Sequence, residues 1–400
     1  MYPKKRFFMV CYSMEQEPLM RHSLMTKTIL LSPKELSTLR ANTTAWQPLI
    51  GVCDGFMDYE PDPMIVFSTE SSYNATGHTE NKPSDRLSIP AAIALRQALC
   101  YQLTGDTKYA TKAQYIIDQW YKTLRRIESL SGQGVIGFHF LPYIVSADWV
   151  RDVNGWDSEY FGEFLNDIVL PQTRIAYKNN IASWWCALTA GIHAYNDNYE
   201  GLLEVRDYFK EQIGEQVCIT KGIGVCASSY LKTNGVSDMS FETAQWSMPD
   251  EITRSNTSNF HGGNDKGIKG ISYSHFGMLP WTLALEILFK EGINLYETTQ
   301  GRYFQNVFNK MVGWVKTPST FPYANKGTNT PEKLLNVKQC SYFAPLVKRF
   351  KASQDGDQTA INDAIAILDD AGGIQGDRWQ LDLMYRGKWN PPSGFEDEGN

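Results

Sequence analysis

The sequence has no apolar run long enough to cross a membrane, and we therefore expect no membrane insertion. Its seven cysteines lack the Cys-x-x-Cys spacing of zinc sites, and their odd number does not predict a disulfide framework. Only 20% of the residues are charged and the net charge is −6, which argues against general affinity for nucleic acid. Complete motifs for a phosphate-binding loop, a dinucleotide cofactor or a catalytic Ser/His/Asp set are also lacking. We expect neither a metal nor a cofactor.

What the sequence contains in quantity is apolar and aromatic residues. Hydrophobic residues make up 42% of the 400 positions, which is enough for one large core or for two domains. Aromatic residues reach 13%, with eleven tryptophans, an excess that is typical of proteins that stack on sugar rings, although large cores use aromatic residues too. The first twenty residues hold only a short, interrupted apolar run and make a poor signal peptide.

Most of the chain has apolar residues at helical spacing. Ser32 before Pro33 predicts a helix over 32–41 with Ser32 as its N-cap. Two helices over 88–105 and 106–127, the second capped by Asp106, predict a helical hairpin. Further helices are predicted over 135–153, 158–177 (broken or ended near Pro171), 179–197, 198–216, 274–292, 298–316, 337–352 and 358–372. Helical hairpins repeated around a ring account most simply for this pattern, and we expect an all-α fold.

The segment 44–83 is the main exception to the helical pattern. It is rich in Pro, Gly, Asn and Ser without a sustained period, so we expect a long loop or lid region there. Irregular chain of that length is more often functional than not. Strand-like alternation is confined to Pro63–Thr69 and Gln216–Ala227. Because no linker divides the chain, we expect a single domain over 1–390, followed by a flexible tail over 391–400.

Side chains that can carry chemistry are concentrated between Gln245 and Ile287. Glu251 and Arg254 stand three residues apart, which on a helical turn places them on one face, where they can pair. The polar segment 255–270 contains four glycines and is a flexible loop by composition. Tyr273 and His275 follow it at the entrance of a long apolar helix. This arrangement could close over an anion.

Three sequence blocks carry a family resemblance. The first is the hairpin ALRQALCYQLTGDTKYATKAQYIIDQW, the second is KNNIASWWCALTAGIHAYND, and the third combines PDEITR with YSHF. In this order they resemble a helical hairpin, the Asn-Asn-His segment, and the Pro-x-Glu-x-x-Arg and Tyr-Ser-x-Phe segments of the alginate lyase superfamily of polysaccharide lyases. The resemblance covers roughly Ser84–Phe289 and implies an incomplete (α/α) toroid.

The resemblance implies β-elimination of a 4-linked uronic acid polymer, so the expected partner is an acidic polysaccharide. Asn180 and Arg254 match the residues that neutralise the uronate carboxylate, onto which charge spreads in the transition state. Tyr273 matches the catalytic tyrosine, which takes the C5 proton as tyrosinate and returns one to the leaving O4. Because the pKa of tyrosine is about 10, a nearby guanidinium is needed to make the phenolate accessible. Glu251 would orient Arg254, and His275 is a further catalytic candidate.

The sequence departs from the family pattern in two places. Ile181 stands where the superfamily has histidine, and it can neither hydrogen-bond a carboxylate nor act as a base. Unless another histidine replaces it, with His261, His275 and His139 as candidates, the enzyme should be limited to syn elimination, which suits mannuronate and glucuronate. The second departure is the inserted loop 255–270, from which His261 is a candidate to enter the cleft.

Other residues are candidates for substrate binding, and each also has a purely structural interpretation. Asparagines cap helices, spaced charges pair on surfaces, tyrosines and tryptophans fill cores, and most lysines are simply solvated. The order of the motifs favours the functional interpretation for Asn180, Arg254 and Tyr273. The substrate-binding candidates are Asn179, Trp184, Trp185, Trp246, His261, His139, Arg86 and Lys266.

Two other functions remain open from the sequence. A glycoside hydrolase on a similar toroid would need two carboxylates facing each other across the cleft, with candidates Asp148, Asp152, Glu159, Asp250 and Glu251. A non-catalytic carbohydrate-binding protein would be consistent with Ile181. The substrate class favours an extracellular, periplasmic or virion-associated location over the cytoplasm, and the sequence leaves the oligomeric state open.

Overall fold

The computed structural model describes residues 28–69, 83–174, 180–212, 270–320, 340–352, 356–370 and 381–388. Within these ranges the chain is built from helices, joined by one pair of two-residue strands. The predicted strand segment at 216–227, the loop 255–270 up to residue 269, and the tail 391–400 lie outside the described residues. The all-α architecture expected from the apolar periodicity is confirmed.

The chain enters the fold through two consecutive helices. Helix α1 (Pro33–Ala41) has the predicted cap, because the Ser32 side chain accepts from the Glu35 amide while the Glu35 side chain accepts from the Ser32 amide. Helix α2 (Thr43–Gly55) corrects the prediction of irregular chain from residue 44. Trp46, Leu49 and Cys53 are buried along one face of α2, and this burial stabilises a helix whose loop-like composition concealed it.

The predicted hairpin is formed by α3 (Pro83–Thr104) and α4 (Thr107–Tyr121), which pack against each other. Gly105 adopts φ 75° in the turn, a conformation that glycine reaches without strain. The Asp106 side chain then accepts from the Lys108 amide and caps α4. Both local signals that predicted this turn are therefore confirmed.

The region predicted as one helix over 135–153 is two helices, α5 (Leu130–His139) and α6 (Leu141–Val150). Pro142 follows the break, and its missing N–H and its ring prevent α5 from continuing. After α6 come α7 (Ser158–Phe164), a π-helical turn η1 (Leu165–Val169) and a 3₁₀ turn η2 (Leu170–Arg174). The predicted interruption near Pro171 is thus a change of helix type.

The next helices are α8 (Asn180–Tyr195), α9 (Tyr199–Gln212) and α12 (Gly270–Lys290). They are followed by α13 (Thr299–Lys316), the 3₁₀ turn η4 (Pro318–Thr320), α15 (Phe343–Lys351), α16 (Gln358–Asp370) and α17 (Leu381–Arg386). Each falls on a predicted helical segment except η4 and the short α17. The Thr298 side chain caps α13 by accepting from the Gly301 amide at 3.2 Å.

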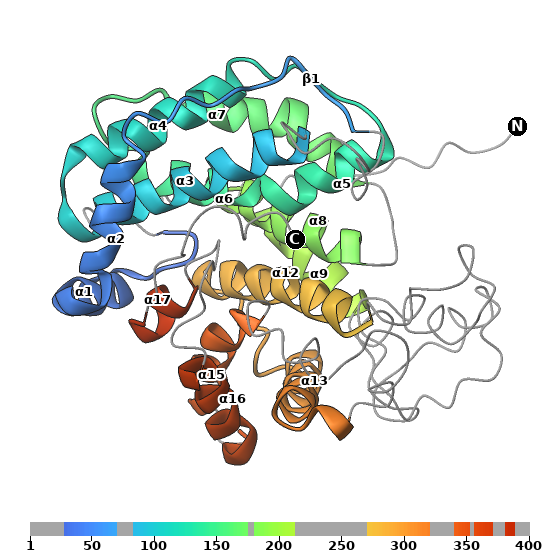
Figure 1. The fold of residues 1–400 in the computed structure, drawn as a ribbon. Coiled ribbons are helices and arrows are strands. Elements are labelled where there is room, and N and C mark those ends of the chain that lie inside the picture. The colour runs from blue at the N-terminus through green and yellow to red at the C-terminus, as the bar shows by residue number, and fades with distance from the viewer. Residues whose placement is uncertain are drawn as a thin grey trace, which may run out of the picture.

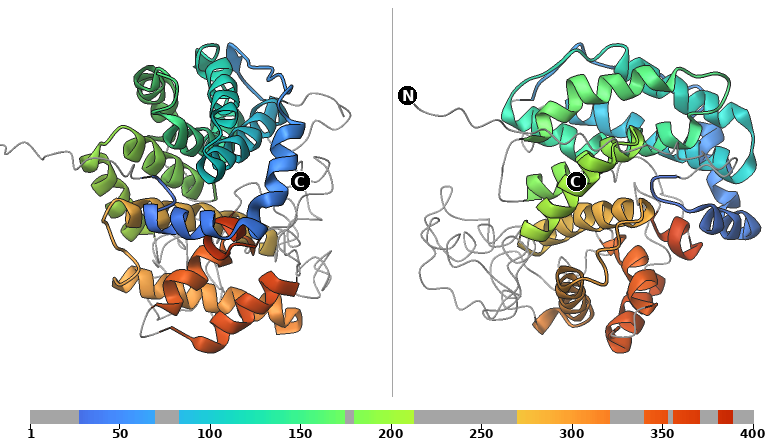
Figure 2. Two further views of the ribbon diagram at one scale, coloured as in Figure 1. Left: turned by 90° about the vertical axis from the view of Figure 1, so that its left-hand side faces the viewer. Right: turned by 180° about the vertical axis from the view of Figure 1, so that it is seen from behind.

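The helices form two groups with α12 along their boundary. Figure 1 shows α3 to α7 in the upper group and α13, α15 and α16 in the lower group, and the rear view in Figure 2 shows α8 and α9 connecting the two. Helix α12 packs along α8, and α15 contacts α16 and α17. A single hydrophobic core cluster runs through both groups.

One strand pair connects the start of the chain to the α4–α5 connection. Strands β1 (Val66–Phe67) and β2 (Arg126–Ile127) pair in parallel, with Phe67 opposite Ile127. β1 lies in the segment where strand alternation was predicted, whereas β2 was not predicted. Within the described ranges, no helix is long and apolar enough to span a membrane, and no cluster of His, Cys, Asp and Glu could hold a metal ion.

Candidate active site

Helices α8 and α12 pack against each other near their N-termini, and the sequence assigns chemistry to the first turn of both. Helix α8 begins at Asn180, and Tyr273 lies in the first turn of α12. The rings of Trp184 and Phe276, each about one turn further along its helix, lie 5.2 Å apart between centroids. Because the two helices are in contact here, the backbones that carry Asn180 and Tyr273 lie on adjacent helix starts.

Three aromatic rings, those of Phe138, Trp184 and Phe276, pack together next to these two turns, and we call them the aromatic floor. Phe138, near the end of α5, has its ring 5.9 Å from Trp184 and 5.0 Å from Phe276, both edge to face. Trp184 and Trp185 are each only 3% exposed. The structure therefore places these two predicted stacking residues in the core beneath the helix starts, where they fix the position of α8.

Trp185 is held from the side of α5. Its indole Nε1 donates to the backbone carbonyl of Gln133 at 3.3 Å. A Cβ atom at Gly137 would lie 3.0 Å from the Trp185 ring, a tight contact, so the close approach of α5 and α8 favours a glycine there. Gln133 also donates from Nε2 to Oε1 of Gln172 in η2, at 2.9 Å.

His275, a predicted catalytic residue, is buried in the second turn of α12. It is 1% exposed, and its Nδ1 lies 3.0 Å from the hydroxyl of Tyr342. Burial lowers the pKa of His275 to about 3, so the imidazole is neutral at ordinary pH. This location favours a structural role beneath the Tyr273 turn over direct contact with a substrate.

Two other predicted binding residues lie within the described ranges. Arg86 in α3 donates from Nη2 to Oδ1 of Asp62 at 2.7 Å and from Nε to the Asp62 carbonyl at 3.0 Å. These bonds fasten α3 to the segment before β1 and engage the guanidinium. His139, the last residue of α5, is half-buried, with its ring 6.2 Å from that of Phe138 at the edge of the aromatic floor.

The remaining predicted site residues are not positioned by these contacts. Asn180, Ile181 and Tyr273 are located by their backbones alone. Six predicted site residues lie outside the described residues: Asn179, Trp246, Glu251, Arg254, His261 and Lys266.

The electrostatics of two adjacent helix starts favour anions. The first N–H groups of a helix have no partner within it, and the aligned peptide dipoles place about half a positive charge at its N-terminus. α8 and α12 are 16 and 21 residues long, so both carry the full effect. Carboxylates are therefore expected to be stabilised where the two helices begin.

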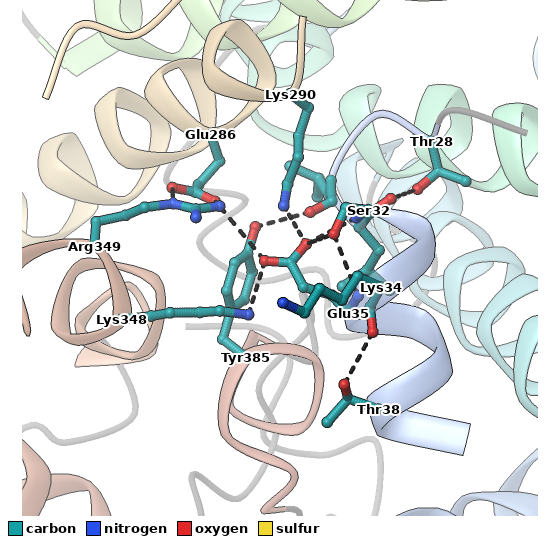
Figure 3. Close-up of polar contacts among 12 residues, drawn as sticks. Thr28, Ser32, Lys34, Glu35, Thr38, Glu286, Lys290, Lys348, Arg349 and Tyr385 are labelled. Carbon is teal, nitrogen blue, oxygen red and sulfur yellow. Dashed lines mark hydrogen bonds and ion pairs between the residues drawn. The ribbon is translucent and has the colours of Figure 1, made fainter. Parts of the chain in front are cut away.

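A second polar cluster lies at the other end of α12 (Figure 3). We call it the Glu35 cluster, and it comprises Glu35, Glu286, Lys290, Lys348 and Arg349. Glu35 accepts from Lys290 and from Nζ of Lys348, the latter at 2.7 Å. Arg349 holds Glu286 with two parallel bonds, Nε to Oε1 at 2.8 Å and Nη2 to Oε2 at 2.7 Å.

The Glu35 cluster is suited to holding helices together. Burial opposes ionisation of Glu35, but Lys290 and Lys348 outweigh it and lower the pKa to about 2. Glu286 is 1% exposed and also accepts from the Tyr296 hydroxyl at 2.6 Å. Since both carboxylates are occupied by partners from α1, α12 and α15, the cluster links the start of the chain to its C-terminal helices.

Sequence reasoning missed both Gln133 and the Glu35 cluster. Gln133 lies 39 positions from Gln172, and Glu35 lies 255 positions from Lys290, so no local spacing connects the partners. The capping box of Ser32 and Glu35 was the only local sequence signal for this cluster. It predicts the start of a helix but not that Glu35 binds Lys290 and Lys348.

The sequence model of the family described as "Alginate lyase" matches residues 61–221 and 238–321. The chain belongs to the alginate lyase family. This match covers more than half of the sequence and includes all three motif blocks. This alginate lyase family member is accordingly a polysaccharide lyase, and no curated protein sequence matches it.

Two solved structures share its fold. The crystal structure of an alginate lyase from Bacteroides ovatus superposes with a TM-score of 0.64 at 11% identity, over 90% of this chain and 99% of that one. A variant of alginate lyase A1-III complexed with a tetrasaccharide superposes with a TM-score of 0.51 at 17% identity, over 75% of this chain and 80% of that one. This lyase is therefore an (α/α) toroid, as the resemblance implied.

Proposed function

We propose that this lyase cleaves 4-linked uronic acid polymers, of the polymannuronate or glucuronan type, by syn β-elimination. The observation that carries the proposal is the contact between Trp184 and Phe276, which brings the starts of α8 and α12 together. Asn180 and Tyr273, predicted to act on the same sugar, stand on these two starts. A tetrasaccharide bound to a lyase of the same fold supports an oligosaccharide as the ligand.

The chemical problem is to remove the C5 proton next to a carboxylate. The negative charge of that carboxylate opposes formation of a carbanion, so neutralising it lowers the barrier. Asn180 donates hydrogen bonds to the carboxylate, and Arg254 supplies a full positive charge. The N-terminal dipoles of α8 and α12 add partial positive charge at the same place.

Tyr273 acts as both base and acid. As tyrosinate it takes the C5 proton, and as tyrosine it returns a proton to O4 when the glycosidic bond breaks. The electron pair of the C5–H bond forms the C4=C5 double bond, and the pair of the C4–O4 bond leaves with the oxygen. Arg254 lowers the pKa of the phenol toward the working pH, and Glu251 orients Arg254.

Ile181 determines the stereochemistry in this proposal. An aliphatic side chain at this position of α8 cannot take a proton from the face opposite Tyr273. In mannuronate and glucuronate the C5 proton and O4 lie on the same side of the ring, so Tyr273 handles both. Guluronate, whose C5 proton lies on the opposite side, should be a poor substrate.

Asp148, one of the candidate carboxylates of the glycoside hydrolase alternative, does not support that alternative. Asp148 has the raised pKa that a general acid needs, about 6, and burial is the cause. Its oxygens are engaged, however, by the amide of Ile29 at 2.9 Å and by Arg151 at 3.0 Å. Asp148 thus holds the start of the chain against α6, and the family favours elimination.

The test follows ultraviolet absorbance during incubation with polymannuronate, glucuronan and polyguluronate, because elimination creates a conjugated C4=C5 double bond. We expect absorbance to rise on the first two polymers and not on polyguluronate. Tyr273→Phe should lower kcat by about 10²- to 10⁴-fold, the usual contribution of a general acid and base.

The matched control is Tyr160→Phe, on α7, where the ring is 61% exposed. It makes the same change outside the site and should keep full activity. New reducing ends without absorbance would overturn the lyase mechanism. Equal rates on polyguluronate would overturn syn elimination by a single tyrosine.

A further inference from the structure

Gln133 makes two contacts that flank the predicted carboxylate-binding residue Asn180. Its side-chain Nε2 donates to Oε1 of Gln172 at 2.9 Å, and its backbone carbonyl accepts from Nε1 of Trp185 at 3.3 Å. Gln172 stands eight positions before Asn180 in the chain, and Trp185 stands five positions after it. One residue of α5 therefore contacts both η2 and α8, the helix that begins at Asn180.

The N-terminus of α5, which carries Gln133, is itself held in place by hydrogen bonds. The Ser129 side chain donates to the Thr69 carbonyl at 2.8 Å and accepts from the Gly132 amide at 3.0 Å, which caps α5. Ser129 adopts φ 63°, a left-handed conformation that is uncommon for a residue with a side chain and persists only when its surroundings hold it. The start of α5 is thus tied to the end of β1.

Gln172, the partner of the Gln133 side chain, lies in an irregular stretch of helix. Gln172 lies in the 3₁₀ turn η2, which directly follows the π turn η1. Neither turn has the regular hydrogen-bond ladder of an α-helix, so side-chain contacts contribute more to its position. Among the described contacts of η2, the Gln133 side chain supplies the side-chain bond from α5.

We propose that Gln133 is a positioning residue for catalysis, which holds η2 against the start of α8 so that Asn180 meets the uronate carboxylate. This inference rests on the proposed function, because it assumes that Asn180 neutralises the substrate. Gln133 acts through Gln172 and Trp185, and it does not touch the sugar. Gln133 matters in this proposal because it fixes the position of α8 relative to α12.

A displacement of Asn180 affects the transition state more than the bound substrate, because charge spreads onto the carboxylate only as the C5 proton leaves. Misplacement by about 1 Å can cost about 100-fold in rate. We therefore expect Gln133→Ala and Gln172→Ala each to lower kcat by about 10- to 100-fold, with KM changed by less than about threefold. Because both substitutions break the same bond, the double variant should be no slower than the slower single variant.

A conservative variant separates positioning from simple loss of packing. Gln172→Glu keeps an oxygen that accepts from Nε2 of Gln133, and it should restore kcat to within about threefold of the unsubstituted enzyme. The matched control is Gln114→Ala in α4. Gln114 also bridges two elements, donating to the carbonyls of Val150 and Val153 at 2.9 and 2.8 Å, so its loss should lower stability and leave kcat unchanged.

The experiment measures kcat and KM on polymannuronate for these variants and for Asn180→Ala, with folding checked by circular dichroism. A large loss in Asn180→Ala together with full kcat in both single alanine variants of the glutamine pair would overturn the positioning role alone. Additive losses in the double variant would overturn it as well. Full activity in Asn180→Ala would instead overturn the assignment of Asn180, and the inference would fall with it.

Discussion

The two ends of α12 use polar residues in opposite ways. Its first two turns contain Tyr273 and His275, and the buried His275 is neutral. At its end, Glu286 and Lys290 enter the Glu35 cluster, where positive and negative charges are paired. In the proposed function the first end receives the charge of a substrate carboxylate, whereas the charges at the second end are already paired within the protein.

The difference shows that a dense cluster of buried charge is not by itself a functional site. The carboxylates of the Glu35 cluster have partners on other helices, Lys290 on α12 and both Lys348 and Arg349 on α15. Tyr273 and Glu286 are separated by about 20 Å along α12, at 1.5 Å per residue. The two ends should therefore respond independently to substitution, and this can be tested.

The largest effect on stability is expected from Arg349→Met. This change removes both bonds to Glu286 and leaves a carboxylate that is 1% exposed without its cation. Breaking a buried pair on one side costs about 3–5 kcal/mol, so the midpoint of urea denaturation should fall strongly. kcat per folded molecule should not change.

The matched control is Arg126→Met, which breaks a pair with Glu128 whose side chains are 66% and 47% exposed. An exposed pair contributes at most about 1 kcal/mol, so this variant should unfold almost like the unsubstituted protein. A drop in kcat for Arg349→Met at a temperature where it is fully folded would break the separation between the two ends.

The two ends should also lose stability in different pH ranges. Burial lowers the pKa of His275 from 6.5 to about 3, so unfolding takes up a proton and stability falls as pH drops below 6.5 toward 3. Lys290 and Lys348 lower the pKa of Glu35 from 4.5 to about 2 against the opposing effect of burial, so its contribution is lost as pH falls from 4.5 toward 2. Each pKa unit corresponds to about 1.4 kcal/mol.

Stability measured against pH in two variants separates these contributions. His275→Asn keeps an acceptor for the Tyr342 hydroxyl and should flatten the curve between pH 6.5 and 4.5. Glu35→Gln should reduce stability above pH 4.5 and make the curve less steep between pH 4.5 and 2, where the His275 contribution persists down to about pH 3. If Glu35→Gln instead removed the loss between pH 6.5 and 4.5, the assignment of these two ranges would be wrong.

The smallest expected effect is that of Ser32→Ala. The Ser32 hydroxyl accepts from the Glu35 amide at 3.2 Å and donates to Oε2 of Glu35 at 2.8 Å. Losing such a cap costs about 1 kcal/mol. Thr298→Ala removes the cap of α13, which has no part in the Glu35 cluster, and should cost a similar amount.

The two caps differ in what they do to the acid response. Ser32→Ala also removes a hydrogen bond to the ionised Glu35, so it should weaken the loss of stability below pH 4.5 slightly. Thr298→Ala should leave that response unchanged. Identical acid profiles would show that Ser32 supports the helix start alone.

Local features of the fold could be predicted from the sequence, and distant contacts could not. Gly105 and Asp106 identified the hairpin turn because the required backbone conformation and cap are encoded at the turn itself. Helix α2 was missed because its burial, not its composition, stabilises it. The break between α5 and α6 was missed although Pro142 is visible in the sequence. The apolar pattern continues across Pro142, and a proline is also common in the first turn of a new helix.

The candidate site divides in the same way. The motif order predicted that Asn180 and Tyr273 act together, and both lie at starts of helices that pack side by side. The burial of Trp184, Trp185 and His275 depends on which faces of α8 and α12 meet, and this is decided by packing across the whole core. Sequence spacing places an aromatic residue on a helix but does not determine which way that face turns.

The bond between Tyr385 and Leu30 has a consequence for synthesis of the chain. The Tyr385 hydroxyl donates to the Leu30 carbonyl at 3.0 Å across 355 positions, and Lys348 reaches Glu35 in the same region. The first described helix and the residues before it therefore cannot make these contacts until Lys348 and Tyr385 have left the ribosome. Early helices such as α3 and α4 can pair while translation continues, but closure of the molecule is a late and slow event.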